Sequence, residues 1–169
     1  MTMQAARIWY APGSRTVSLD FLYKRLTGLL GCTVAHTEWV LGETRIPQLH
    51  VTAPVSMLIQ IANHDDVAAE AIEFASFIES NSGPSSASAK MRTCTRRLEI
   101  GAPDDAGTSS KDGTVVIGPT ALDPADPATH RILVGLTSGL DGVFEDNVNG
   151  RLIVTPRKPK GLLARLLRR

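Results

Sequence analysis

The stretch "NHDDVAAEAIEFASFIES", residues 63–80, carries the clearest secondary-structure signal in the chain. Acidic residues occupy its first turn, and Asn63 or Asp65 is placed to cap it, as the positive end of a helix dipole favours. Its apolar residues recur at three- and four-residue spacing, which predicts an amphipathic helix. The expected buried stripe consists of Val67, Ala71, Ile72, Ala75 and Ile78.

Strand patterns flank this helix on both sides. The apolar run "SMLIQIA" (56–62) is typical of a central strand, and "TRRLEIG" (95–101) alternates with Leu98 and Ile100 facing inward. Further strands are predicted at 6–13, 32–41, 48–53 and 114–118, and "GVFEDNVNGRLIV" (142–154) reads as a hairpin with an Asn-Gly turn. Two more helices are predicted at 18–31, capped by Ser18, and at 123–142, capped by Asp126.

The predicted order of elements is β-α-β-β-α-β-β-α-β-β. Strands separated by helices, with hairpins between some of them, favour an α+β fold built as a two-layer sandwich. We expect a mixed or antiparallel sheet with about three helices on one face, in a ferredoxin-like variant. Residues 1–154 are expected to form a single domain, and residues 155–169 a basic amphipathic C-terminal tail.

The charge of the chain is unevenly distributed. The net charge of +1 combines six basic residues in the tail with twelve basic and seventeen acidic residues before it, so residues 1–154 carry −5. An acidic body has no electrostatic reason to bind nucleic acid. The hydrophobic content of 43% argues against global disorder.

Compartment and redox state are predicted from the cysteines and the N-terminus. Cys32 and Cys94 are far apart, have no metal-ligand spacing and stand beside strand patterns, so they are expected to be buried thiols. The N-terminus lacks the apolar core of a signal peptide, and no run approaches the about 18 apolar residues of a membrane span. The expectation is a cytoplasmic protein of bacterial type.

Metal ligation has one candidate. His36 and Glu38 stand two apart on a strand, so their side chains share a face, and other histidines and carboxylates could join them. The possible additional ligands are His50, His64, Asp65 and Asp66. The solvent face of a strand is the favoured explanation of the pair, so we expect neither a metal nor a cofactor.

Catalytic motifs are absent from the sequence. The oxygen-rich "FEDNVNG" (144–150) lacks the spacing of a calcium-binding loop, and its residues suit a tight hairpin. Cys94 would have a lowered pKa if Arg96 and Arg97 approached its thiol, but neighbours along a strand point to opposite faces. The sequence therefore favours a protein that is not an enzyme.

The tail "TPRKPKGLLARLLRR" combines an extended, proline-containing start with an amphipathic end. Leu162, Leu163, Leu166 and Leu167 share a helical face, and Arg165, Arg168 and Arg169 lie mostly off it. Nine residues are too few for a stable lone helix, so this end needs a surface to dock on. Docking on protein, either its own body or a partner, is favoured over peripheral membrane contact and over nucleic acid.

Three segments together resemble a known class of proteins. "MLIQIANHDDVAAEAIEFA", "CTRRLEI" and "LDGVFEDNVNGRLIV" are similar to small bacterial immunity-type proteins encoded with polymorphic toxins of contact-dependent or type VI systems, over residues 57–153. The resemblance implies a non-enzymatic protein that neutralises a protein partner such as a cognate toxin. An exposed acidic patch formed by Asp104, Asp105, Glu145 and Asp146 at a loop and a turn would suit that role.

The sequence is therefore compatible with three functions. The favoured one is a protein-binding module with an immunity or regulatory role. The second is a small-molecule-sensing α+β domain that uses the sheet face or a dimer interface as its pocket. The third is an enzyme with a dispersed site that uses His36, Glu38 or Cys94.

Overall fold

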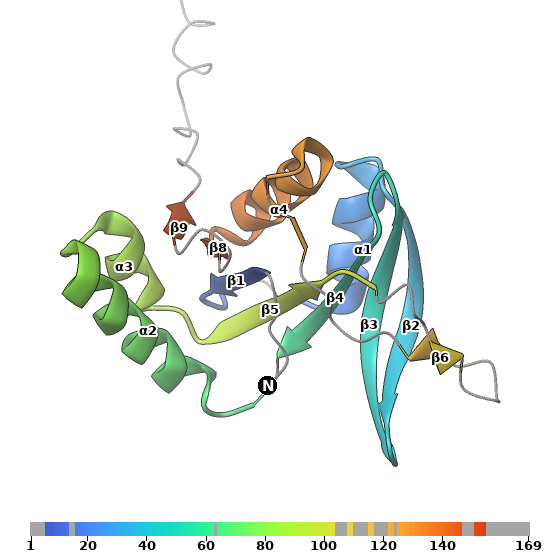
Figure 1. The fold of residues 1–169 in the computed structure, drawn as a ribbon, viewed down its shortest axis with the longest axis horizontal. Coiled ribbons are helices and arrows are strands. Elements are labelled where there is room, and N and C mark those ends of the chain that lie inside the picture. The colour runs from blue at the N-terminus through green and yellow to red at the C-terminus, as the bar shows by residue number, and fades with distance from the viewer. Residues whose placement is uncertain are drawn as a thin grey trace, which may run out of the picture.

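Four helices pack around one antiparallel sheet in the computed structural model (Figure 1). The structure describes residues 6–13, 16–62, 64–103, 108–109, 115–116, 122–123, 125–146 and 151–154. Within that part of the chain the sheet has seven strands, in the order β2-β3-β4-β5-β1-β8-β9. No helix in these ranges is long and apolar enough to cross a membrane.

Most elements lie within or close to their predicted ranges, but β3 begins at Thr44 and not at 48, and β6 lies where no strand was predicted. The strands of the sheet are β1 (Ala6–Tyr10), β2 (Thr33–Leu41), β3 (Thr44–Ala53), β4 (Met57–Ala62), β5 (Arg96–Gly101), β8 (Val143–Asp146) and β9 (Arg151–Val154). A separate pair is formed by β6 (Thr108–Ser109) and β7 (Val115–Val116). The helices are α1 (Leu19–Gly28), α2 (Val67–Ser82), α3 (Ser86–Met91) and α4 (Pro127–Leu140).

The centre of the sheet has the strand order of a ferredoxin-like fold. β1 and β4 each pair antiparallel with β5 and so run parallel to one another, with β5 between them. β5 and β8 each pair antiparallel with β1 and so also run parallel to one another, with β1 between them. Two split β-α-β units of this kind, through α1 and through α4, define the core order β8-β1-β5-β4. The predicted α+β class and antiparallel sheet are confirmed.

The larger hydrophobic core lies between the sheet and the helices α1 and α4. Its sheet side chains come mainly from β1, β3, β4, β5 and β8, and its helical side chains repeat at three- and four-residue spacing. Members of this core include Ile8, Tyr10, Leu22, Leu26, Leu49, Ile59, Leu98, Ile100, Ile132, Leu136 and Phe144. Two predicted caps are present: Ser18 accepts a hydrogen bond from the Phe21 amide at 3.2 Å, and Asp126 from the Thr129 amide at 2.9 Å. The cap predicted for α2 at Asn63 or Asp65 is wrong, because the N-cap is Asp66 and its side chain makes no capping hydrogen bond.

The other two helices cover the opposite face of the sheet, which differs from the prediction that the helices share one face. Trp9 and Val143 pack with α2 and α3, whereas their chain neighbours Ile8 and Phe144 face α1 and α4. The reason is that β1 has a large apolar side chain on each face, Ile8 on one and Trp9 on the other, so both faces of this strand are covered by helices. A second cluster results: Trp9, Ala62, Val67, Ala71, Ala75, Met91, Cys94 and Val143.

Candidate functional site

The predicted acidic patch does not form in the way the sequence suggested. Glu145 and Asp146 lie within β8, where they pair in register with Arg7 and Ala6 of β1. Their exposed fractions are 2% and 0%, so these two residues are part of the interior and not of an exposed turn. The strand continues through them because its partner β1 is long enough to pair with both.

The remaining residues predicted to bind partners lie outside the described part of the chain. Asp104 and Asp105 follow β5 in the sequence. The predicted docking residues of the tail also fall beyond β9: Leu162, Leu163, Arg165, Leu166, Leu167 and Arg168.

The candidate metal ligands His36 and Glu38 each interact with a side chain from elsewhere in the chain, and not with one another. The His36 ring stacks on Tyr23 with ring centroids 5.1 Å apart, and its Nε2 lies 3.7 Å from an Asp20 carboxylate oxygen. Glu38 accepts a hydrogen bond from Arg45 at 3.0 Å. Among the described residues, no three His, Cys, Asp or Glu side chains are grouped so that they could hold a metal ion.

Cys94 is enclosed beneath α3. Its exposed fraction is 2%, and its Sγ donates to the Lys90 carbonyl oxygen at 3.5 Å. Burial raises the pKa of the Cys94 thiol to about 11, against a smaller lowering by the charge of Lys90. The thiol is therefore protonated at neutral pH, and a protonated thiol is a poor nucleophile.

A buried arginine connects the sheet to α2. Arg97, only 5% exposed, forms ion pairs with Glu70 of α2 and with Glu99, the latter at 2.5 Å. Its guanidinium carbon lies 4.8 Å from the centroid of the Trp9 ring, a cation–π contact. Nη2 also lies 3.5 Å from His64 Nε2. One guanidinium thus fixes a helix, a strand and an aromatic side chain together.

Glu145 completes this network from β8. Its Oε2 accepts a hydrogen bond from Trp9 Nε1 at 2.6 Å, and its Oε1 lies 3.7 Å from a guanidinium nitrogen of Arg7. Burial raises the pKa of Glu145, whereas the bond from Trp9 and the charges of Arg7 and Arg97 act in the opposite direction. The indole ring of Trp9 is therefore held on its edge by Glu145 and on its face by Arg97.

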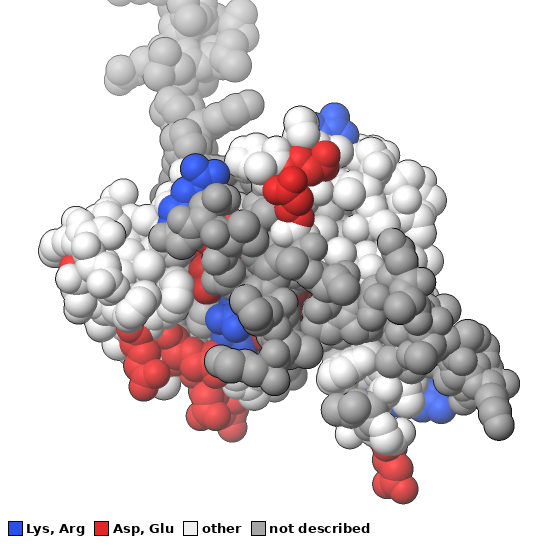
Figure 2. Space-filling model, viewed as in Figure 1, with Lys and Arg blue, Asp and Glu red and all other residues white. Residues whose placement is uncertain are grey.

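Above this network, one flank of α2 forms a surface with both acidic and aromatic side chains. Glu70 lies four residues after Asp66, the adjacent pair Glu73 and Phe74 lies one turn further on, and Phe77 follows one turn after that, so these residues share one side of the helix. We call this set the α2 surface. Phe77 is 61% exposed and lies against the half-buried Phe74, with ring centroids 6.3 Å apart. Figure 2 shows acidic side chains gathered along this helix and the turn before it.

The α2 surface is hollowed where it meets the sheet. The hollow has a volume of about 270 Å³ and is lined by Arg7, Trp9, Glu70, Glu73, Phe74 and Phe77. Its floor is the indole ring that the buried network holds, and its rim carries the carboxylates of α2. It can accommodate an apolar side chain flanked by positive charge.

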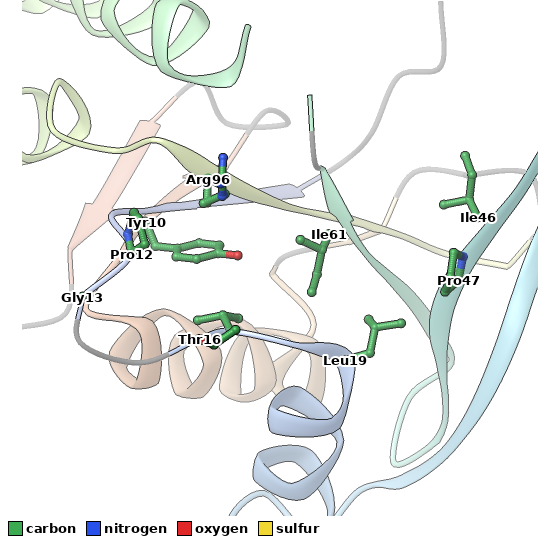
Figure 3. A pocket seen from close by; sticks show the side chains of 10 residues that line it. Tyr10, Pro12, Gly13, Thr16, Leu19, Ile46, Pro47, Ile61 and Arg96 are labelled. Atoms are coloured by element: carbon green, nitrogen blue, oxygen red, sulfur yellow. The ribbon is translucent and has the colours of Figure 1, made fainter. Parts of the chain in front are cut away.

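A larger pocket opens where β1 and β4 end and β5 and α1 begin (Figure 3). Its volume is about 540 Å³, and it is lined by Tyr10, Pro12, Gly13, Thr16, Val17, Leu19, Ile46, Pro47, Ile61 and Arg96. We call it the Tyr10 pocket. Figure 3 shows the Tyr10 side chain reaching across it, with the hydroxyl directed toward Ile61.

Comparison of the chain with protein families, with curated proteins and with solved structures finds no match.

Sequence reasoning missed the residues that build the α2 surface, although a signal for it is present. The predicted stripe is correct for Val67, Ala71 and Ala75, but Ile72 is 48% exposed. Phe74 and Phe77 stand beside that stripe and have acidic neighbours one turn away. Phe74 and Phe77 are three residues apart and form a second apolar stripe on a helix that already has a buried face. Such a stripe indicates a second surface that can contact another molecule, and this pattern was recognisable in the sequence.

Proposed function

We propose that this chain is a non-enzymatic protein-binding module that neutralises or regulates a protein partner through the α2 surface. The observation that carries the proposal is Phe77, a largely exposed aromatic side chain beside a hollow floored by Trp9. Large aromatic side chains in and around a central hollow are typical anchors of protein interfaces. The resemblance to immunity-type proteins supports the same class of function.

Rigidity of the surface favours tight binding. Glu70 on the rim is held by Arg97, and Trp9 in the floor is held by Arg97 and Glu145. Side chains that are already fixed lose little conformational entropy when a partner docks. The buried network thus has a role at the surface, because it keeps the hollow in one shape.

Charge defines the chemistry of the partner. Asp66 and Glu73 form no ion pair with other described residues, and residues 1–154 carry a charge of −5. Acidic rims attract basic partners and speed their encounter. The partner is therefore a protein segment with lysine or arginine residues around an apolar side chain, as a toxin surface that handles an anionic substrate would present.

The test is affinity capture from a lysate of the source organism, with three full-length baits carrying no change, Phe77→Asp or Glu73→Lys. Phe77→Asp removes the anchor and Glu73→Lys reverses the rim charge, so each is expected to reduce recovery of the partner by about tenfold or more. Recovery is measured by quantitative mass spectrometry after nuclease treatment. Capture by the unchanged bait is expected to weaken as the salt concentration rises, because salt screens the attraction between the acidic rim and a basic partner.

Ile72→Asp is the matched control, because Ile72 is an exposed apolar residue on the other flank of the same helix. Capture that survives in this control and fails in both α2-surface variants supports the proposal. Equal recovery by all baits would contradict it. If capture increases after Leu166→Asp, the chain's own residues 161–169 compete with the partner for the α2 surface, and the surface is then assigned to the tail.

A further inference from the structure

We propose that the Tyr10 pocket is a binding site for a small organic carboxylate with an apolar body. This inference goes beyond protein binding by the α2 surface and does not depend on it. The two sites share no lining residue, and the adjacent residues Trp9 and Tyr10 point to opposite faces of β1.

The pocket has the size and position of a ligand site. Its volume of about 540 Å³ falls within the range of about 300–1,000 Å³ that is common for small-molecule pockets. It lies at the end of the sheet, where chain segments from β1, β3, β4, β5 and the start of α1 converge (Figure 3). Strand ends and the loops between them often form binding sites, because a rigid sheet positions them.

The walls of the pocket are predominantly apolar. Aliphatic or proline side chains approach it from three elements and from the loop before α1: Pro12, Val17, Leu19, Ile46, Pro47 and Ile61. Val17 and Ile61 also pack on the main core, so these walls are anchored. Such walls favour a ligand with a hydrocarbon or aromatic body, since burying apolar surface is what they can stabilise.

Two hydrogen-bond donors define the polar part of the site. The Tyr10 hydroxyl points into the pocket and makes no hydrogen bond with another described residue. Arg96 bonds only to the Thr95 carbonyl oxygen, at 3.4 Å, and pairs with no carboxylate in the described ranges. No acidic residue is among the described lining residues. Arg96 is exposed, and its guanidinium is therefore accessible to an anionic ligand.

Tyr10 and Arg96 pair in register on neighbouring strands, so their side chains leave the same face of the sheet. Burial raises the pKa of Tyr10 to about 12, and the charge of Arg96 opposes that rise. The hydroxyl therefore remains a donor at neutral pH, and the charge of Arg96 reaches it. A guanidinium binds a carboxylate through two parallel hydrogen bonds, and a phenol hydroxyl can donate a third.

A single charge distinguishes a carboxylate from a phosphate ester in this site. Arg96 is the one cationic side chain among the described lining residues, and it balances a monoanion. A dianion would retain an unbalanced charge next to the apolar walls, which costs free energy. A monocarboxylate whose body is aromatic or branched therefore fits both halves of the pocket.

The experiment titrates the full-length chain with benzoate, phenylacetate and 3-methylbutanoate by isothermal titration calorimetry. Benzamide and inorganic phosphate serve as the neutral and dianionic comparison probes. At least one carboxylate is expected to bind at millimolar concentration or below, and benzamide at least about tenfold more weakly than benzoate. Arg96→Met should weaken carboxylate binding about tenfold or more, and Tyr10→Phe several-fold.

Arg45→Met is the matched control, because Arg45 is an exposed strand arginine outside the Tyr10 pocket. Binding that is unchanged in Arg96→Met, equal for benzoate and benzamide, or stronger for phosphate overturns the proposal. So does the absence of binding by all three carboxylates. An amide chemical-shift map of the unmodified chain with the tightest carboxylate needs no variant: shifts centred on Tyr10, Ile61 and Arg96 support the site, and shifts centred elsewhere refute it.

Discussion

Glu145 shows how a single side chain acquires its properties from its neighbours. A carboxyl group in the interior is stabilised in its neutral form by burial, and here burial is the largest influence on the pKa. Trp9, Arg7 and Arg97 all favour the charged form and limit the rise. The balance leaves the pKa of Glu145 above its ordinary value of 4.5.

This balance predicts a pH-dependent contribution to stability. A carboxyl whose pKa is higher in the folded chain holds its proton more tightly there, so its contribution is present below the unfolded pKa and is lost as pH rises through the folded pKa. Glu145→Gln does not titrate. The free energy of unfolding of the wild type minus that of the variant, measured with urea, should therefore fall between acidic and neutral pH.

Taking that difference removes the influence of other carboxyls. Glu79 and Asp126 have lowered pKa values, because of hydrogen bonds from Arg92 and from Thr129, and they act with the opposite sign in both proteins. A difference that is constant with pH would mean that the pKa of Glu145 is the same in the folded and unfolded chain, and a difference that rises would mean that folding lowers it; either result contradicts the prediction.

At the scale of elements, the junction between α4 and β8 depends on a close backbone approach. A Cβ on Gly142 would lie 2.5 Å from the carbonyl oxygen of Trp9 and 3.2 Å from a methyl carbon of Ile8. The helix therefore ends at Leu140 and the chain passes directly over β1 before it enters β8. Because that atom belongs to the backbone of a central strand, it has little room to move.

Gly142→Ala is accordingly predicted to lower the free energy of unfolding by about 1–3 kcal/mol, the usual range for overpacking. Gly28→Ala, at the end of α1, has open space around the new methyl group. It should instead raise stability by about 0.5–1 kcal/mol, since alanine is the better helix former. Urea unfolding of both variants measures the contrast, and a loss of the same size in both would contradict the close-approach argument.

At the scale of the whole molecule, Arg97 joins two layers that the hydrophobic effect alone would leave less firmly oriented. It contacts Glu70 in α2, Glu99 in its own strand and the ring of Trp9 in the neighbouring strand. The α2 helix has a narrow inner stripe of small residues, Val67, Ala71 and Ala75. An ion pair at its edge therefore contributes much to its orientation on the sheet.

Arg97→Met is predicted to destabilise the fold by about 3–5 kcal/mol, because it removes a buried guanidinium together with its ion pairs to Glu70 and Glu99 and its contact with the Trp9 ring. Adding Glu99→Gln and Glu70→Gln should recover a large part of that loss. Urea unfolding measures the stability, and near-ultraviolet circular dichroism reports the environment of Trp9. A loss below about 1 kcal/mol would mean that solvent already screens the network.

The sequence by itself determined the local elements of this protein. The three- and four-residue spacing located α1, α2 and α4, and the residue types at their starts identified Ser18 and Asp126 as caps, because these signals depend only on near neighbours. The break at Pro54 between β3 and β4 and the pairing of β8 with β9 were also predictable from local residues.

Only the tertiary structure decided which face each helix covers and where the charged side chains lie. Periodicity shows that an element has an apolar side but does not identify the surface that covers it, and β1 contributes Ile8 to one hydrophobic cluster and Trp9 to the other. Trp9 and Glu145 are 136 positions apart in the chain, so no local pattern could indicate that they meet. Glu145 is buried and Phe77 is exposed because pairing and packing across the whole chain place them so, and these contacts are long-range.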